Sequence, residues 1–395
     1  MNRTTKRLTA FFLCLTMLVG ALCMTVSAEK AGRDDSCLKY RYYTYVGDSV
    51  SWGYGLDEKL DPLAASSVFV PVENAFAGIV GKVLKENNPD AQVVCAACNG
   101  GRLADFRMAL ESGMGISDPY IYPDDVFGMR SYERTMLLQG SGDYLVDNLK
   151  KSDLVTVTLG ANDLASVLVN TVCALDFVDF DKIQSLTDTA SKLEYAIYAI
   201  QAAAKQKNML GDVMDALKDG VAGLRENQAE VVKDIVGIAP DDADILLVGY
   251  FVPMDRFRLL PGTDSSFLME ILGTVFTLYN DAFEKIASEY SNVYYVDAPD
   301  ADIFFEEGTL LTDALALLGT DSDSFLLGIH PNADGQKYIS ERVLDKLVEI
   351  NTARQPQTTA ALPVRTITYV VETVAKAVNN AAKTVKGIFS SVFKR

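Results

Sequence analysis

Five short runs of β-branched and aromatic residues, separated by longer stretches with helical periodicity, most constrain the fold of this 395-residue chain. Each run is apolar nearly throughout, as in strands of a parallel sheet that helices cover on both faces. Strands that alternate with helices predict one α/β domain with a doubly wound sheet. The expected strands are 41–47, 91–97, 154–160, 244–252 and 292–298, and the expected helices are 73–87, 132–150, much of 181–236, 265–290 and 335–350.

Other segments extend this α/β domain, which we expect to span 29–351. The stretch from about 163 to 243 is too long for one crossover, so we expect a helical insertion over one end of the sheet. Polar, proline-containing residues 352–365 predict a linker. Residues 366–395 have apolar side chains at helical spacing beside lysine and asparagine, which predicts a basic amphipathic helix. Such a helix either docks on its own acidic domain or contacts an anionic membrane or cell-wall surface.

The first 28 residues have the pattern of a secretory signal peptide. Arg3, Lys6 and Arg7 form a basic start, an apolar run follows, and small residues precede a cleavage site expected after Ala28. The alternative is an uncleaved membrane anchor, because the apolar run is nearly long enough to span a bilayer. We therefore expect a secreted, extracellular protein that is cell-surface associated if the C-terminal helix binds there.

Charge and cysteine content exclude several classes of protein. The formal net charge is −17, and the acidity lies in the central domain, which argues against nucleic-acid partners. Four cysteines follow the signal peptide, namely Cys37, Cys95, Cys98 and Cys173, and an even number allows two disulfides. The Cys95–Cys98 pair has no second pair at ligand spacing, and the chain has one histidine. We therefore expect no metal site and no cofactor.

Polar or glycine-containing motifs follow the first three expected strands. "GDSVSWGYGL" places Ser49 where the first strand enters a helix, and backbone N–H groups at such a point can stabilise an oxyanion. "NGGRLADF" places Gly100 where backbone must approach a ligand closely. "GANDL" places the Asn162 amide at a third strand end, with Asp163 able to cap the following helix. Ligands of open α/β sheets bind at this edge.

The single histidine, His330, follows the last expected strand in "GIHPNADG". A nucleophilic serine needs a base, and imidazole is the side chain suited to that task near neutral pH. His330 is therefore the only imidazole available to Ser49. Trp52, the only tryptophan, lies one helical turn after Ser49 and either lines an acyl pocket or packs in the core.

These blocks resemble those of the GDSL, or SGNH, hydrolase superfamily, which is named for a Ser, a Gly, an Asn and a His in four blocks. The resemblance covers about 41–350. It implies a flavodoxin-like sheet with strand order 2-1-3-4-5 and ester hydrolysis through an acyl-enzyme. It also implies that Ser49 is the nucleophile, that His330 is its general base, and that the Ser49 and Gly100 N–H groups with the Asn162 side chain form the oxyanion hole.

The chain departs from the family pattern at one position. The last block of the family usually has an acid three residues before the histidine, and here Leu327 stands in that place. Loss of the acid from a triad costs about 10⁴ in kcat. Three explanations compete: Asp321 or Asp323 reaches the imidazole from another backbone position, a backbone carbonyl accepts the Nδ1 proton, or the site is inactive.

The resemblance and the signal-peptide pattern together predict a secreted serine esterase that acts on an acyl ester. The candidate substrates are O-acetylated glycans, small esters and lysophospholipids. The alternative is a catalytically impaired protein of the same fold that binds a glycan or lipid, and Leu327 is the observation that motivates it.

Overall fold

A five-stranded, wholly parallel sheet with strand order β2-β1-β3-β4-β5 forms the centre of the computed structural model. The strands are β1 (Tyr42–Gly47), β2 (Gln92–Ala97), β3 (Leu154–Thr158), β4 (Asp244–Val248) and β5 (Val293–Val296). This order confirms the expected doubly wound, flavodoxin-like topology. The structure describes residues 33–57, 68–120, 140–164, 166–167, 210–250, 265–297 and 330–354.

The burial of the strands explains why they have apolar sequences. Every residue of the inner strands β3 and β4 is buried, whereas β2 and β5 at the two edges include half-buried or exposed positions. A strand covered on both faces has no side for polar residues, so it lacks the alternation of a half-exposed strand. All five expected strands are confirmed, and each end coincides with the expected one or lies up to four residues inside it.

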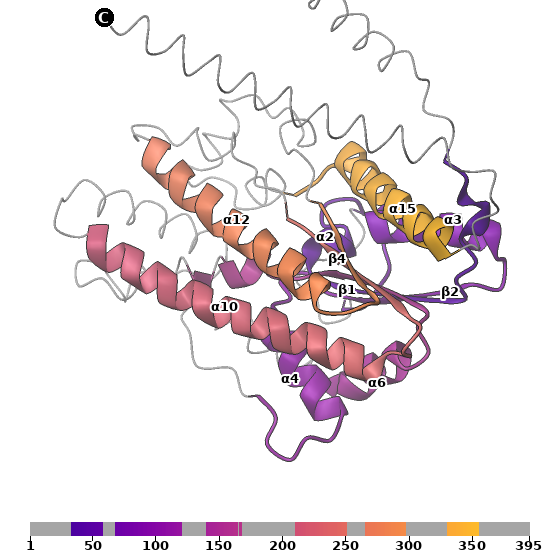
Figure 1. Ribbon diagram of the computed structural model, residues 1–395, viewed down its shortest axis with the longest axis horizontal. Coiled ribbons are helices and arrows are strands. Elements are labelled where there is room, and N and C mark those ends of the chain that lie inside the picture. The colour runs from indigo at the N-terminus through magenta and orange to yellow at the C-terminus, as the bar shows by residue number, and fades with distance from the viewer. Residues whose placement is uncertain are drawn as a thin grey trace, which may run out of the picture. The chain divides into compact units, whose positions relative to one another are not determined.

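Helices cover both faces of the sheet (Figure 1). Helices α4, α6 and α10 pack against one another on one face, α10 also packs on α12, and α3 and α15 lie on the opposite face. The helices are α2 (Ser49–Trp52), α3 (Phe76–Asn87), α4 (Leu103–Gly113), α6 (Gly142–Leu149), α10 (Leu210–Ile238), α12 (Ser265–Ser288) and α15 (Ala333–Arg354), preceded by the 3-10 turn η1 (Asp35–Cys37).

Helix α10 is the part of the expected 163–243 insertion for which helical structure is described at length. It contacts α4 and α6, so this part belongs to a helical layer along the sheet. The stretch 168–209 lies outside the described residues, as do the expected signal peptide and the amphipathic helix 366–395. Helix α15 runs to Arg354, so residues 352–354 of the expected linker are helical, and the rest of that linker lies outside the described residues. In the described part of the chain, no helix is both long and apolar enough to cross a bilayer.

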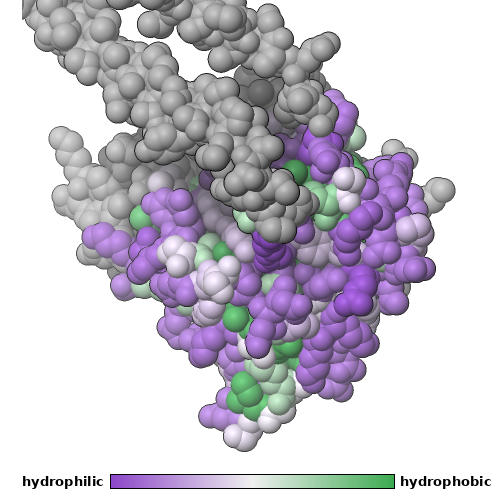
Figure 2. Space-filling model, turned by 45° about the vertical axis from the view of Figure 1, so that its right-hand side comes forward, coloured by the Kyte–Doolittle hydropathy of each residue, from purple (hydrophilic) through white to green (hydrophobic). Residues whose placement is uncertain are grey.

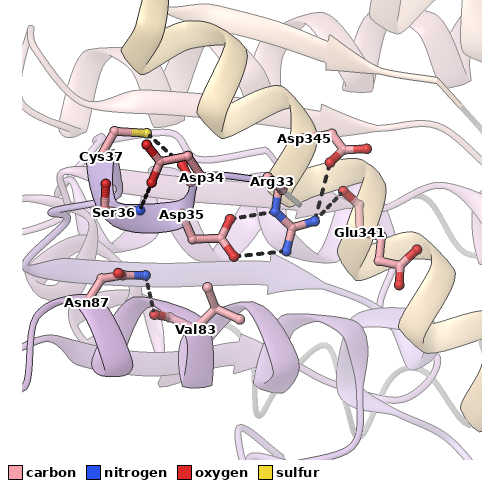
Figure 3. A network of polar contacts seen from close by, with 9 residues as sticks. All are labelled: Arg33, Asp34, Asp35, Ser36, Cys37, Val83, Asn87, Glu341 and Asp345. Carbon is pink, nitrogen blue, oxygen red and sulfur yellow. Dashed lines mark hydrogen bonds and ion pairs between the residues drawn. The ribbon is translucent and has the colours of Figure 1, made fainter. Parts of the chain in front are cut away.

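Arg33 fastens the start of the described chain to α15 (Figure 3). Its Nη2 donates to Asp35 Oδ2 at 3.2 Å, and its Nη1 lies 3.3 Å from Asp345 Oδ1 and 3.5 Å from the carbonyl oxygen of Glu341. The Arg33 and Asp345 side chains are 23% and 48% exposed, so water screens this ion pair. The ion pair therefore contributes little to the free energy of unfolding, although it holds Arg33 against α15.

The cysteines do not form both disulfides that their number allows. Cys37 and Cys95 are free thiols, and Cys173 lies outside the described residues. Cys95 is buried on β2, where a free cysteine packs as a small apolar side chain. On the face drawn in Figure 2, the described surface is mostly hydrophilic and its hydrophobic residues form small groups, in keeping with the acidic composition.

Candidate active site

Three loops leave the carboxyl edge of the sheet side by side. In the parallel register Gly47 at the end of β1 pairs with Ala97 of β2 and with Thr158 of β3. Beyond that row, Cys98 N donates to Gly47 O at 3.0 Å, and Asp48 N donates to Thr158 O at 2.9 Å. The Ser49, Gly100 and Asn162 blocks therefore start from neighbouring positions, as the sequence predicts.

Ser49 is the first residue of α2, a single helical turn. Asp48 caps this turn, because its Oδ1 accepts from Val50 N at 3.0 Å. So short a helix has only a small dipole. Stabilisation of an anion at this point therefore depends on individual backbone N–H groups. Glycine is required at position 47 because neighbouring side chains lie too close for a Cβ. A Cβ there would be 2.4 Å from Ser51 Oγ and 2.5 Å from Thr158 Oγ1.

His330 lies just before α15 and reaches Ser49 across 281 residues of sequence. Its Nε2 is 2.8 Å from Ser49 Oγ, a hydrogen-bond distance between the two side chains. This is the geometry that a serine and its general base require, with the imidazole proton on Nδ1 when Nε2 accepts from the hydroxyl.

Gln336 links α15 to the serine side of the site. Its Nε2 donates to Val50 O at 3.1 Å, and its Oε1 accepts from Phe76 N at 2.8 Å. The side chain is completely buried. Because Val50 follows Ser49 and Gln336 lies in the helix that His330 precedes, this one amide ties the two catalytic candidates together.

Tyr54 stacks on the His330 imidazole. The ring centroids are 4.5 Å apart and the planes are inclined by 28°. Gly53, with φ of +88° in the left-handed region, ends α2 and turns the chain so that Tyr54 follows. A Cβ on Gly53 would also lie 2.8 Å from Ala75 Cβ, so glycine is needed twice over.

Asn162 and Asp163 hold the glycine-containing loop. Asn162 Nδ2 donates to Gly101 O at 3.1 Å. Asp163 Oδ2 accepts from Leu103 N at 2.9 Å, and the carboxylate also accepts from the Ala104 backbone. The expectation that Asp163 caps the helix following it is wrong: it caps α4, whose own preceding residue is Arg102 and supplies no capping oxygen. Gly100 has φ of +74°, a conformation that favours glycine.

Two buried carboxyls, those of Asp48 and Asp163, belong to these loops. Burial raises the pKa of Asp48 to about 7, although hydrogen bonds from Tyr250 and Val50 act in the opposite direction. Burial likewise raises the pKa of Asp163 to about 7, against the hydrogen bond from Leu103. Tyr250, from the segment after β4, donates its hydroxyl to Asp48 Oδ2, and burial raises the pKa of this phenol well above its usual value.

The Arg102–Asp105 ion pair completes the surroundings of the glycine loop. Arg102 Nη2 lies 2.9 Å from Asp105 Oδ1, and the two side chains are 1% and 0% exposed. Asp105 Oδ2 also accepts from the Arg102 backbone N–H at 3.1 Å. Since both charges are paired and hydrogen-bonded, the pair fixes the start of α4 directly after Gly100 and Gly101.

The structure thus brings together Ser49 and His330, and places Asn162 against the glycine loop. Trp52 is 2% exposed and belongs to the core. Asp321, Asp323 and Leu327 lie outside the described residues. Sequence reasoning missed Tyr54, Gln336 and Tyr250; Tyr54 was visible only as part of the "GDSVSWGYGL" block. Within the described ranges, no cluster of three His, Cys, Asp or Glu residues could hold a metal ion.

Comparison with known protein families gives a match over most of the chain. A family model described as the GDSL-like lipase/acylhydrolase family matches residues 45–338. No curated protein matches the chain.

Solved structures similar to this chain include an extracellular lipase from Streptomyces rimosus, with 16% identity and a TM-score of 0.39 over 78% of this chain and 99% of the other. A phospholipase A1 from Streptomyces albidoflavus NA297 has 18% identity, a TM-score of 0.39 and the same two coverages. An acetylxylan esterase from Geobacillus stearothermophilus has 12% identity and a TM-score of 0.32 over 78% and 94% of the chains.

Proposed function

The chain belongs to the GDSL-like lipase/acylhydrolase family, and we propose that it is a serine esterase, a carboxylic ester hydrolase, in which Ser49 is the nucleophile and His330 the general base. The observation that carries this proposal is the 2.8 Å contact between Ser49 Oγ and His330 Nε2. A serine hydroxyl is a weak nucleophile until an adjacent base takes its proton, and this contact supplies the base.

The reaction then runs in two halves. Ser49 Oγ attacks the acyl carbon while its proton passes to His330 Nε2, and the alcohol leaves with that proton. Water attacks the acyl-enzyme, gives a proton to Nε2, and releases the acid as Ser49 Oγ regains its hydrogen. Each half places negative charge on the former carbonyl oxygen and positive charge on the imidazole.

We assign the oxyanion hole to the backbone N–H groups of Ser49 and Gly100 and to Asn162 Nδ2. The bond from Asn162 Nδ2 to Gly101 O supports this assignment, because it fixes the amide while its nitrogen carries a second hydrogen for a ligand. Donors held in place before the reaction cost no reorganisation when the charge develops.

Leu327 stands where the family usually has its acid, so the group that orients His330 is open. Three possibilities make different predictions for one double variant. If Asp321 or Asp323 takes that role, the double variant Asp321→Asn/Asp323→Asn lowers kcat by about 10²–10⁴. If a backbone carbonyl accepts the Nδ1 proton, the double variant retains the wild-type kcat. An inactive site gives no turnover in either protein.

The substrate classes that we propose are O-acetylated glycans, small esters and lysophospholipids. We further propose that the chain is exported through residues 1–28, and that the basic segment 366–395 contacts a membrane or cell-wall surface. The alternation of lysine with apolar residues at helical spacing in that segment supports the contact.

Hydrolysis of short p-nitrophenyl esters tests the esterase proposal. We expect Ser49→Ala and His330→Ala to abolish turnover, with Ser288→Ala, an exposed serine at the end of α12, as the matched control. A serine-directed phosphonate should label wild type stoichiometrically at Ser49. If wild type shows neither turnover nor labelling, the result favours the alternative, a glycan- or lipid-binding protein of this fold. Leu327 is the observation that motivates this alternative.

A further inference from the structure

We propose that Tyr54 is a positioning residue for His330: its ring fixes the plane of the imidazole, and its π-face stabilises the imidazolium that forms during catalysis. The inference rests on the proposed function, because it assigns a role in the chemistry of Ser49 and His330. It adds a contact on the face of the imidazole, whereas an acid or a carbonyl would act on the ring edge at Nδ1.

Tyr54 is bound to both catalytic candidates. Its backbone N–H donates to Ser49 O at 3.0 Å, and its ring stacks on His330 with centroids 4.5 Å apart. The residue is 7% exposed, so water has little access to the contact. One residue thus contacts both catalytic candidates, Ser49 through its backbone and His330 through its ring.

The backbone conformation on either side of Tyr54 places its ring against His330. Gly53 adopts φ of +88°, and its missing side chain admits Ala75 and Val72 against the turn. Gly55 follows with φ of +81°. Tyr54 thus lies between two left-handed glycines, which make an abrupt change of chain direction on either side of it.

The chemistry explains why a ring is useful here. Proton transfer from Ser49 Oγ makes His330 cationic, and a cation within about 6 Å of an aromatic centroid is attracted by the negative face of the ring. The attraction is larger for the imidazolium of the transition state than for the neutral imidazole of the resting enzyme. Tyr54 therefore stabilises the charged state selectively, which is the condition for raising kcat.

A fluorinated ring separates the electrostatic role from simple packing. Tyr54→Phe keeps the aromatic face, whereas pentafluorophenylalanine at position 54 keeps the ring shape but reverses the polarity of that face. Both variants lack the Tyr54 hydroxyl, so Tyr54→Phe is the reference for the fluorinated variant. Relative to Tyr54→Phe, the fluorinated variant should lose about three- to thirtyfold, mainly in kcat with KM little changed.

The single histidine allows a readout that does not depend on activity, because all imidazole NMR signals come from His330. The fluorinated variant should titrate at lower pH than Tyr54→Phe, by about half a unit to one unit. Phe283→Leu, which removes a buried ring packed on Tyr279, serves as the control and should leave the His330 titration unchanged.

Equal kcat values and equal imidazole titrations in the two ring variants would overturn the proposal. If the chain hydrolyses no ester but the titrations differ as expected, the stacking role stands and the esterase proposal fails. If turnover occurs and Ser49→Ala abolishes it while the two ring variants behave alike, the esterase proposal stands and the role of Tyr54 fails.

Discussion

Asp48, directly before Ser49, is a fully buried carboxyl of the site. It caps α2 through Val50 N and accepts the Tyr250 hydroxyl, yet burial still raises its pKa to about 7. In the unfolded chain an aspartate has a pKa near 3.9. Between these values the unfolded chain releases a proton that the folded protein retains. The stability from Asp48 is therefore fully present below about pH 3.9 and is lost as pH rises through about 7.

Asp48→Asn should remove this pH dependence while retaining the cap, because asparagine is an equally good N-cap residue. Relative to wild type, we expect the free energy of unfolding of Asp48→Asn to rise by on the order of 3 kcal/mol between pH 4 and pH 8. Urea denaturation at both pH values measures this difference. The exposed Asp90→Asn is the control, and an equal change in both variants would contradict the prediction.

Asn162 offers a second test at the scale of one residue. Asn162→Ala removes the side-chain donor assigned to the oxyanion, and loss of one such donor lowers kcat by about 10²–10³. Steady-state kinetics should show this loss with KM changed far less, since the donor acts on charge that develops in the transition state. If Asn162→Ala has a normal kcat, Asn162 is not part of the oxyanion hole.

At the scale of the elements, α15 carries His330 at its start and is joined to α2 and α3 by Gln336. Gln336→Ala leaves Val50 O and Phe76 N without this partner in a buried region, at a cost of about 1–3 kcal/mol for each group. We expect urea denaturation to show a loss of about 2–6 kcal/mol and the kinetics to show a lower kcat. The neighbouring exposed Lys337→Ala should change neither, and similar results for the two variants would contradict the linking role.

The elements also explain what the sequence could predict. The inner strands have continuous apolar runs because both faces are buried, so β3 and β4 could be located without a structure. Ser49, Gly100 and Asn162 could be placed together because parallel strands bring their ends to one edge. The partner of Asp163 could not, because the cap lies 60 residues away on α4 and nothing in "GANDL" specifies it. Tyr54 was missed for a related reason: its contact depends on the left-handed turn at Gly53.

At the scale of the whole molecule, the surface contact that we propose depends on the difference in charge between the acidic domain and the basic C-terminal segment. The chain has a net charge of −17, whereas residues 366–395 contain lysines together with apolar residues at helical spacing. An anionic bilayer would repel the domain and attract the segment, so the segment would have to carry all of the attraction. Each lysine near such a surface contributes about 1 kcal/mol, and salt screens the effect.

Charge reversal in the full chain tests this division of labour. Lys376→Glu, Lys383→Glu and Lys386→Glu together should lower co-sedimentation with phosphatidylserine-containing vesicles at least tenfold and make the residual binding less sensitive to salt. Vesicles of phosphatidylcholine alone should bind wild type weakly. The control is Lys150→Glu/Lys151→Glu, which alters two exposed charges at the end of α6. If the tail triple variant and this control bind equally well, the segment is not the surface contact, and docking on the acidic domain becomes the explanation for its charge.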